Sequence, residues 1–274
     1  MPLFWLRVAL SFYAVGLLYA LASVWGGRQI LTRITMPAVG LGMTFHFVAI
    51  VENAMGSGAL APASMHEMES LLAFLLMVFF FVVYARYQAT SPGLAVFPLV
   101  FLLTASSALG ANRAAGPNPL FVSTQWIFFH VGLIFIGYAA LLFSFVASLL
   151  YLIQERSLKS LKTGKSGFWT KLPALAVIDD IGYKSLMWGF PFMTLGLISG
   201  AMLGEARQGA AYFLDAKIAL SILTWVIYVA VLYTRWSVGW RGRRAAYLAT
   251  FAFATAVVAW AANSLSHTHR FIAP

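Results

Sequence analysis

Cysteine is absent from the 274 residues of this chain, and charged residues make up only 9% of them. Without a thiol, the chain can form no disulfide, thiolate metal site or iron–sulfur cluster, and no covalent haem link through a Cys-Xaa-Xaa-Cys-His motif. Soluble domains carry about a quarter charged residues, whereas 61% of this chain is hydrophobic and its mean hydropathy is +0.84. The composition predicts an integral membrane protein whose cofactors are held by side chains other than cysteine.

Apolar windows predict eight transmembrane helices and therefore an all-α polytopic helix bundle. A helix needs about 20 apolar residues to cross the bilayer, so eight spans leave no room for a folded domain outside it. We expect residues 1–274 to form a single integral membrane domain. The first apolar run, Pro2 to Trp25, is too long for the core of a cleavable signal and is predicted to be a span. The predicted spans are 3–25, 36–52, 68–85, 93–110, 125–152, 185–203, 214–234 and 245–265.

Basic residues outnumber acidic ones, with 18 Lys and Arg against 8 Asp and Glu. They lie in short segments between apolar runs, so we expect no nucleic acid partner. In the eight-span topology, thirteen of these 18 fall on one side of the membrane and five on the other. The positive-inside rule places the larger group in the cytoplasm. The sequence thus predicts a multi-pass protein of the bacterial inner (cytoplasmic) membrane, in contact with the lipid bilayer, with both termini on the outer side.

Two local patterns predict an interfacial helix and a close helix–helix contact. The longest loop, 153–184, has apolar residues at helical intervals over 172–181, which predicts a short helix lying on the cytoplasmic interface. Gly196 and Gly200 form a small-xxx-small pair in the sixth span, which predicts close approach of a neighbouring helix.

All five histidines fall on the outer half of this topology. Ionisable residues at membrane depth are costly and usually face a cavity or a partner. His130 lies about five residues inside its span, one turn after Trp126 on the same helix face, so we expect a functional role for it. His66, His267 and His269 can equally be interpreted as solvated interface residues. The fifth, His46, lies in the outer part of the second span.

The chemistry of these side chains favours haem over a bare metal ion. Neutral imidazoles in apolar surroundings suit haem iron or a first-row metal. The segment from His66 to Ser70 begins like a zincin motif but has Ser70 where the second histidine should stand, so we expect no hydrolytic zinc site. Phosphate-binding loops, nucleophile elbows and dinucleotide fingerprints are missing from the sequence, so we expect no enzyme.

Haem also needs cations for its propionates. The outward cations are Arg113, Arg207, Lys217 and Arg270. Each of them can also be interpreted as an ordinary interface anchor.

The residues around His130 resemble a known family. The segment 123–131, Ser-Thr-Gln-Trp-Ile-Phe-Phe-His-Val, with 137–141, looks like the part of CcsA-type cytochrome c assembly proteins that carries their first outer haem-ligating histidine. His269-Arg270-Phe271 sits where that family has its second outer histidine. The likeness covers about residues 120–271 and continues through 175–179, 189–191, 194–201, 224–225 and 240–242.

The resemblance implies a non-covalent haem b with two histidine ligands in the outer leaflet. His130 and His269 are then the axial ligands, and His267 is the reserve for His269. His46 and His66 form a weaker second pair, interpreted as pocket lining or a second haem.

Departures from the family pattern modify this expectation. The family's outer loop is rich in tryptophan and cradles haem, and its inner-side histidine is replaced here by Tyr233. These departures resemble the HemX or YpjD-like branch of the superfamily, which lacks that loop. The branch implies a haem-binding assembly or regulatory factor without catalytic turnover, with a cytochrome-assembly or haem-biosynthesis protein as its partner. At the aromatic positions of the loop this chain has Leu203, Gln208, Ala211, Tyr212 and Leu214.

Two other functions stay open on the sequence alone. One is a small-molecule or proton-coupled membrane transporter, in which outer carboxylates such as Glu52 and Glu205 relay protons, although such residues at helix mouths are more often caps. The other is a structural subunit whose basic cytoplasmic loop recruits a partner.

The charge asymmetry generates a topology prediction. Reporter fusions at Pro274 and within the loop between Lys159 and Lys171 should report opposite sides of the membrane, with Pro274 outside, because the side that holds this loop carries 13 of the 18 basic residues. A cytoplasmic reporter signal at Pro274 would overturn the outer placement of all five histidines.

Overall fold

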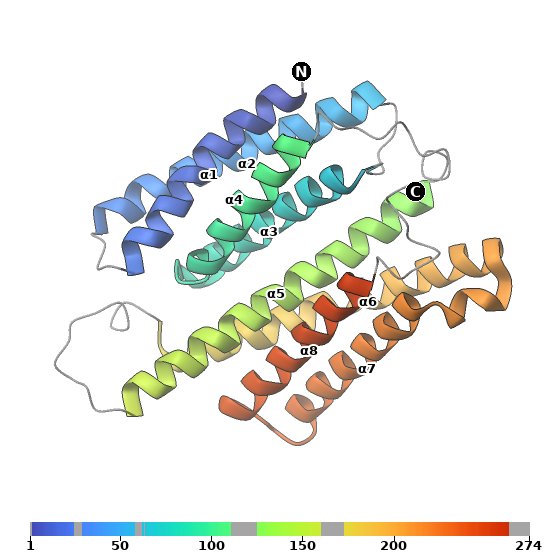
Figure 1. Cartoon of the computed structure of the whole chain (residues 1–274). Coiled ribbons are helices and arrows are strands. Elements are labelled where there is room, and N and C mark those ends of the chain that lie inside the picture. Colours follow the sequence, from blue (N-terminus) through green and yellow to red (C-terminus); the bar gives the residue numbers. More distant parts are fainter. Residues whose placement is uncertain are drawn as a thin grey trace. The chain divides into compact units, whose positions relative to one another are not determined.

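The computed structural model is all-helical over the residues it describes, which are 2–24, 29–57, 62, 64–110, 125–159 and 173–262 (Figure 1). Eight helices in these ranges are long and apolar enough to cross a membrane. The predicted all-α, eight-span architecture is therefore confirmed. The chain divides into two compact units, one of residues 1–125 with 163–173 and one of residues 126–162 with 174–274.

The first unit holds four helices, of which α1 packs against α2 and α4, and α3 packs against α4. Its core is rich in aromatic rings, with Phe80 and Phe97 meeting edge to face at a centroid distance of 4.7 Å. Helix α1 approaches its neighbours closely at Gly16, where an added Cβ would lie 2.9 Å from Cγ1 of Val39. The helices are α1 (Pro2–Val24), α2 (Gln29–Ser57), α3 (Met65–Tyr87) and α4 (Gly93–Gly110).

The second unit holds four further helices and a short 3₁₀ helix. Helices α7 and α8 pack side by side, and η3 connects α6 to α7 (Figure 1). Phe145 of α5 stacks on Phe253 of α8 with ring centroids 4.3 Å apart. Trp225 of α7 donates a hydrogen bond of 2.9 Å to the hydroxyl of Thr194 on α6. The elements are α5 (Gln125–Lys159), α6 (Leu175–Gln208), η3 (Gly209–Leu214), α7 (Ala216–Trp236) and α8 (Arg243–Ala261).

Glycines line the contact between α5 and α6 within the second unit. An added Cβ at Gly182, Gly189 or Gly196 of α6 would meet Ala147, Ala140 or Ile134 of α5 respectively. These glycines recur at intervals of seven residues, which is the spacing of a continuous seam along one helix face. Small residues let helix backbones approach closely in a membrane, where dispersion contacts drive association.

The predicted close packing at the small-xxx-small pair is borne out at the end of this seam. An added Cβ at Gly200 would lie 2.5 Å from Cε1 of His130, so the ring of His130 rests directly on that glycine.

The prediction of a separate interfacial helix over 172–181 is wrong. Residues 175–181 are the first two turns of α6, which continues without a break to Gln208. Gly182 lies within this helix and faces α5, since an added Cβ there would lie 3.4 Å from Cβ of Ala147. The ion pair between Asp180 and Lys184, 2.8 Å long, spans the same turn and supports it.

Helices α5 and α6 are longer than a bilayer requires. At about 1.5 Å of rise per residue, 35 residues of α5 extend about 50 Å, against a hydrocarbon core of about 30 Å. The predicted fifth span ended at residue 152, whereas α5 ends at Lys159. The end of the second unit where α5 finishes and α6 begins therefore reaches beyond the apolar core.

The glycine seam generates a stability prediction. Gly189→Ala should lower the thermal unfolding midpoint of the purified chain in detergent, because the new methyl collides with Ala140 and lies 2.7 Å from the Tyr228 hydroxyl. Overpacking of this kind costs about 1–3 kcal/mol. Gly132→Ala on α5 is the matched control, since no described atom lies within 4 Å of its added Cβ. Equal midpoints for the two variants would show that the seam does not stabilise the second unit.

Candidate functional site

His130 lies near the start of α5, with its ring held against α6. Its Nδ1 lies 2.7 Å from the carbonyl oxygen of Gly196 and 3.5 Å from the hydroxyl of Ser199. The Ser199 hydroxyl donates to the same carbonyl at 2.9 Å. Because Gly196 and Gly200 have no side chains, the ring reaches the α6 backbone directly.

This contact decides which nitrogen of His130 carries the proton. A carbonyl oxygen only accepts hydrogen bonds, so Nδ1 must donate to Gly196. In a neutral imidazole the other nitrogen, Nε2, then keeps its lone pair. No residue in the described ranges hydrogen-bonds Nε2. A backbone carbonyl bound to Nδ1–H is the usual outer partner of a histidine that ligates a metal through Nε2.

A cation lies near this ring. The ammonium of Lys217, in the first turn of α7, acts electrostatically on His130. Asp215 caps α7, with its carboxylate accepting the backbone N–H of Lys217 at 2.9 Å. The start of α7 thus brings positive charge to the end of the second unit that holds His130.

Several predicted site residues lie outside the described ranges. These are His267, His269, Arg113 and Arg270. Arg207 lies in the last turn of α6, where only its backbone is described. Trp126, one turn before His130, is 60% exposed. Of the residues predicted around the first haem ligand, the structure thus places His130 and Trp126, and the second iron ligand stays a prediction.

His46 lies in the first unit and is fully buried. Its Nε2 lies 2.8 Å from the hydroxyl of Ser70, and its Nδ1 lies 3.3 Å from the hydroxyl of Tyr13. The ring also meets Phe74 edge to face at a centroid distance of 5.8 Å. Both nitrogens of His46 are engaged, so binding a metal would require one of these hydrogen bonds to break.

His66 lies in the first turn of α3, and Arg86 lies in the last turn of the same helix. Ser64 caps this end of the helix, its hydroxyl accepting the N–H of Glu67 at 3.2 Å. The ring of His66 packs on Gly110 at the end of α4. Its Nδ1 lies 3.4 Å from Oε2 of Glu69, close enough for an ion pair but without hydrogen-bond geometry. Throughout the described ranges, His, Asp and Glu side chains form no group of three or more that could hold a metal ion.

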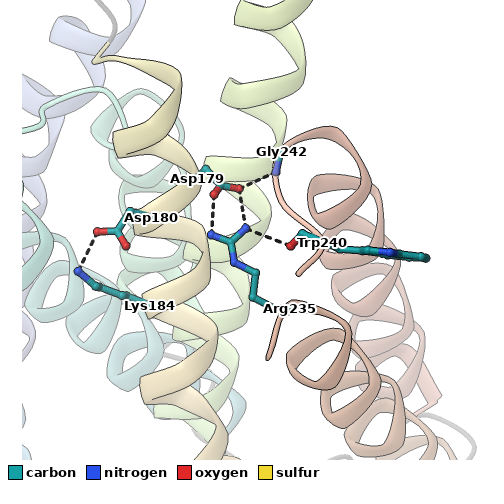
Figure 2. Close-up of polar contacts among 6 residues, drawn as sticks. All are labelled: Asp179, Asp180, Lys184, Arg235, Trp240 and Gly242. Carbon is teal, nitrogen blue, oxygen red and sulfur yellow. Dashed lines mark hydrogen bonds and ion pairs between the residues drawn. The ribbon is translucent and has the colours of Figure 1, made fainter. Parts of the chain in front are cut away.

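A partly buried ion pair that the sequence did not predict lies at the opposite end of the second unit from His130. Arg235 of α7 donates to both carboxylate oxygens of Asp179 on α6, at 2.6 and 3.1 Å (Figure 2). The backbone N–H of Gly242 donates to the same carboxylate at 3.0 Å. Arg235 also donates to the carbonyl of Trp240 and lies 4.8 Å from the ring centroid of Tyr183. Arg235 is one of the 13 basic residues on the predicted cytoplasmic side, and nothing in the sequence around Asp179 identifies it as the partner.

A small cavity adjoins this ion pair. Its volume is about 30 Å³, and Ser144, Ser148 and Tyr151 of α5 line it together with Asp179 and Arg235. The bidentate pair ties α6 to α7, and the bond to Gly242 ties the α7–α8 turn to both.

The loop between α6 and α7 is folded against α6. Tyr212 in η3 is buried against Gly204, and burial raises the pKa of its phenol to about 12, with a smaller contribution from the charge of Asp215. Leu214 is 87% exposed. The resemblance leads one to expect aromatic residues that stack on haem at five positions of this loop. Tyr212 is the residue that keeps an aromatic ring at these positions, and its ring is buried.

Comparison with known proteins identifies relatives along nearly the whole chain. A family model described as Cytochrome C assembly protein matches residues 5–268. A cytochrome c biogenesis protein CcsA of Heterosigma akashiwo is 27% identical over 224 residues, covering 70% of this chain and 69% of that protein. The protein of the same name from Guillardia theta is 26% identical over 267 residues, covering 89% of this chain and 87% of that protein. The family match thus begins well before residue 120, where the likeness in the sequence analysis started.

Proposed function

Since the chain belongs to the cytochrome c assembly protein family, we propose that it binds haem b non-covalently and acts in cytochrome c assembly or haem supply. The relatives are named cytochrome c biogenesis proteins. In this proposal Nε2 of His130 would bind the haem iron. His269 would be the second ligand, with His267 as its reserve.

One observation carries the proposal. The 2.7 Å contact from Nδ1 of His130 to the Gly196 carbonyl fixes the ring orientation and leaves Nε2 as the lone-pair donor. A histidine that only filled space between helices would more often have both nitrogens satisfied, as His46 has. When bound, haem supplies an iron that takes two neutral imidazoles.

The other residues of this end have supporting roles. Lys217 provides positive charge beside His130 for a propionate, as do Arg113, Arg207 and Arg270 in the proposal. Trp126 offers an exposed aromatic face one turn from the ligand. The charge distribution supports placing this end in the outer leaflet of a bacterial inner membrane.

We infer further that the chain belongs to the HemX or YpjD-like branch and retains its haem. Presentation of haem to an apocytochrome needs an exposed aromatic platform, because flat rings hold a flat macrocycle through large apolar contacts. Tyr212 is buried, and Leu203, Gln208 and Leu214 supply no ring. Tyr233, at the position of the family's inner histidine, is 62% exposed at the far end of α7. In this role the chain acts on an assembly or haem-biosynthesis partner without catalytic turnover.

The haem site is tested by spectroscopy on the full chain purified from haem-replete membranes. The wild type should show a Soret band and a low-spin spectrum with two histidine ligands. His130→Gly should lose haem or turn it high-spin, because the proximal nitrogen is gone. Added imidazole should restore the low-spin spectrum if His130 acts as a ligand, whereas it would restore nothing if the ring only filled space.

His66→Ala is the comparison variant, because it removes the same kind of side chain at a position that the sequence assigns to a second, weaker pair of histidines. This variant should keep the low-spin spectrum of the His130 site. Unchanged haem stoichiometry in a His130→Ala, His269→Ala double variant would remove the proposed ligation.

Haem retention is tested by complementation. The chain, expressed in a bacterium that lacks its CcsA-type protein, should not restore c-type cytochromes, because the positions that correspond to the family's tryptophan-rich loop supply no exposed ring. Gel staining for covalently bound haem measures the outcome, and a CcsA-type protein in the same vector is the control. Recovery of stained cytochromes would show that this loop is sufficient for presentation.

A further inference from the structure

Among the residues that the structure describes in the second unit, the turn between α7 and α8 gathers three exposed arginines. Arg241, Arg243 and Arg244 are all exposed. Two large apolar side chains stand beside them, Trp236 at 80% and Val238 at 56% exposure. We refer to residues 236–244 as the basic turn.

The carboxylates at this end of the unit are already paired with other bases. Glu155 pairs with Lys159 at 2.7 Å, and Asp180 pairs with Lys184 at 2.8 Å. Asp179 pairs with Arg235 at 2.6 Å. Asp215 is the last acidic residue of the chain, so the basic turn and α8 contribute none. Within the described ranges, the three arginines of the basic turn therefore have no carboxylate in salt-bridge contact.

The basic turn is held in one shape before any ligand arrives. Asp179 accepts the backbone N–H of Gly242, and Arg235 donates to the carbonyl of Trp240 at 3.3 Å (Figure 2). The ring of Trp240 points away from this ion pair (Figure 2), and the guanidinium of Arg244 lies 5.7 Å from its centroid. Anchoring the backbone and stacking the guanidinium reduce the conformational entropy lost when an anion binds.

Arg243 is held in a similar way. Its guanidinium lies 5.5 Å from the ring centroid of Tyr247, and its Nη2 donates to the Tyr247 hydroxyl at 3.3 Å. Tyr247 is 43% exposed, and Phe251, one turn further along α8, is 57% exposed. An apolar strip thus runs from the basic turn along α8.

The position of the turn defines the partner. It joins two helices that can span the membrane, so it lies at a membrane surface. Tryptophan and arginine side chains at this depth meet phospholipid headgroups. We propose that the basic turn binds the phosphate of an anionic phospholipid through Arg241, Arg243 and Arg244, with an acyl chain along Tyr247 and Phe251. This inference is independent of the haem proposal.

The full chain in detergent, titrated with palmitoyl-oleoyl phosphatidylglycerol or phosphatidylcholine, tests the proposal by native mass spectrometry. Phosphatidylglycerol should bind the wild type more tightly than phosphatidylcholine. The variant Arg241→Gln, Arg243→Gln, Arg244→Gln should lose on the order of 100-fold in phosphatidylglycerol affinity, since each arginine near a headgroup is worth roughly a factor of five. Its phosphatidylcholine binding should not change.

The matched control is Arg7→Gln, Arg33→Gln, Arg86→Gln, which removes the same charge from exposed positions of the first unit. This control should keep the phosphatidylglycerol affinity of the wild type. If both triple variants lost the same phosphatidylglycerol affinity, the effect would come from net charge alone, which would contradict a site at the basic turn. If the basic-turn variant lost no affinity, the basic turn would be excluded as the binding site. Displacement of the lipid by inorganic phosphate alone would identify a site for soluble anions and contradict a lipid site.

Discussion

The close contact between α5 and α6 is the constraint on which the second unit depends. Gly182, Gly189 and Gly196 let the two backbones approach along several turns. At one end of this contact the ring of His130 reaches the carbonyl of Gly196, which bulkier residues on α6 would prevent. At the other end Asp179 of α6 reaches Arg235 of α7. Helix α6 thus contributes both the carbonyl that orients the candidate ligand and the carboxylate that anchors the α7–α8 turn.

Most of the fold could be predicted because membrane spans depend on length and hydropathy, which are properties of the sequence alone. The eight spans and the tight packing at Gly196 and Gly200 follow from such local signals. The start of α6 could not be predicted in this way. The apolar window predicted a span from residue 185, whereas α6 begins ten residues earlier at Leu175, because hydropathy does not show how far a helix continues beyond the bilayer.

In the candidate site too, local sequence signals predict which residues matter, whereas their contacts depend on the fold. Depth in the membrane and position near the start of a predicted span predict a functional role for His130, but its proton position depends on a contact with Gly196, 66 residues away. His46 has the same residue type at similar depth, yet Tyr13 and Ser70 engage both of its nitrogens. Asp179 and Arg235 went unrecognised because each is an ordinary boundary charge until the fold brings them together.

The central claim is that α6 holds His130 as a neutral ring with its proton on Nδ1. Nitrogen NMR of the full chain, prepared without haem and labelled at histidine, measures this directly. The predicted result is a His130 signal with Nδ1 protonated and Nε2 unprotonated. This signal should change in Gly200→Ala, because the added methyl group displaces the ring. A His130 ring protonated at Nε2 in the wild type would contradict the account, since that nitrogen could not then bind iron.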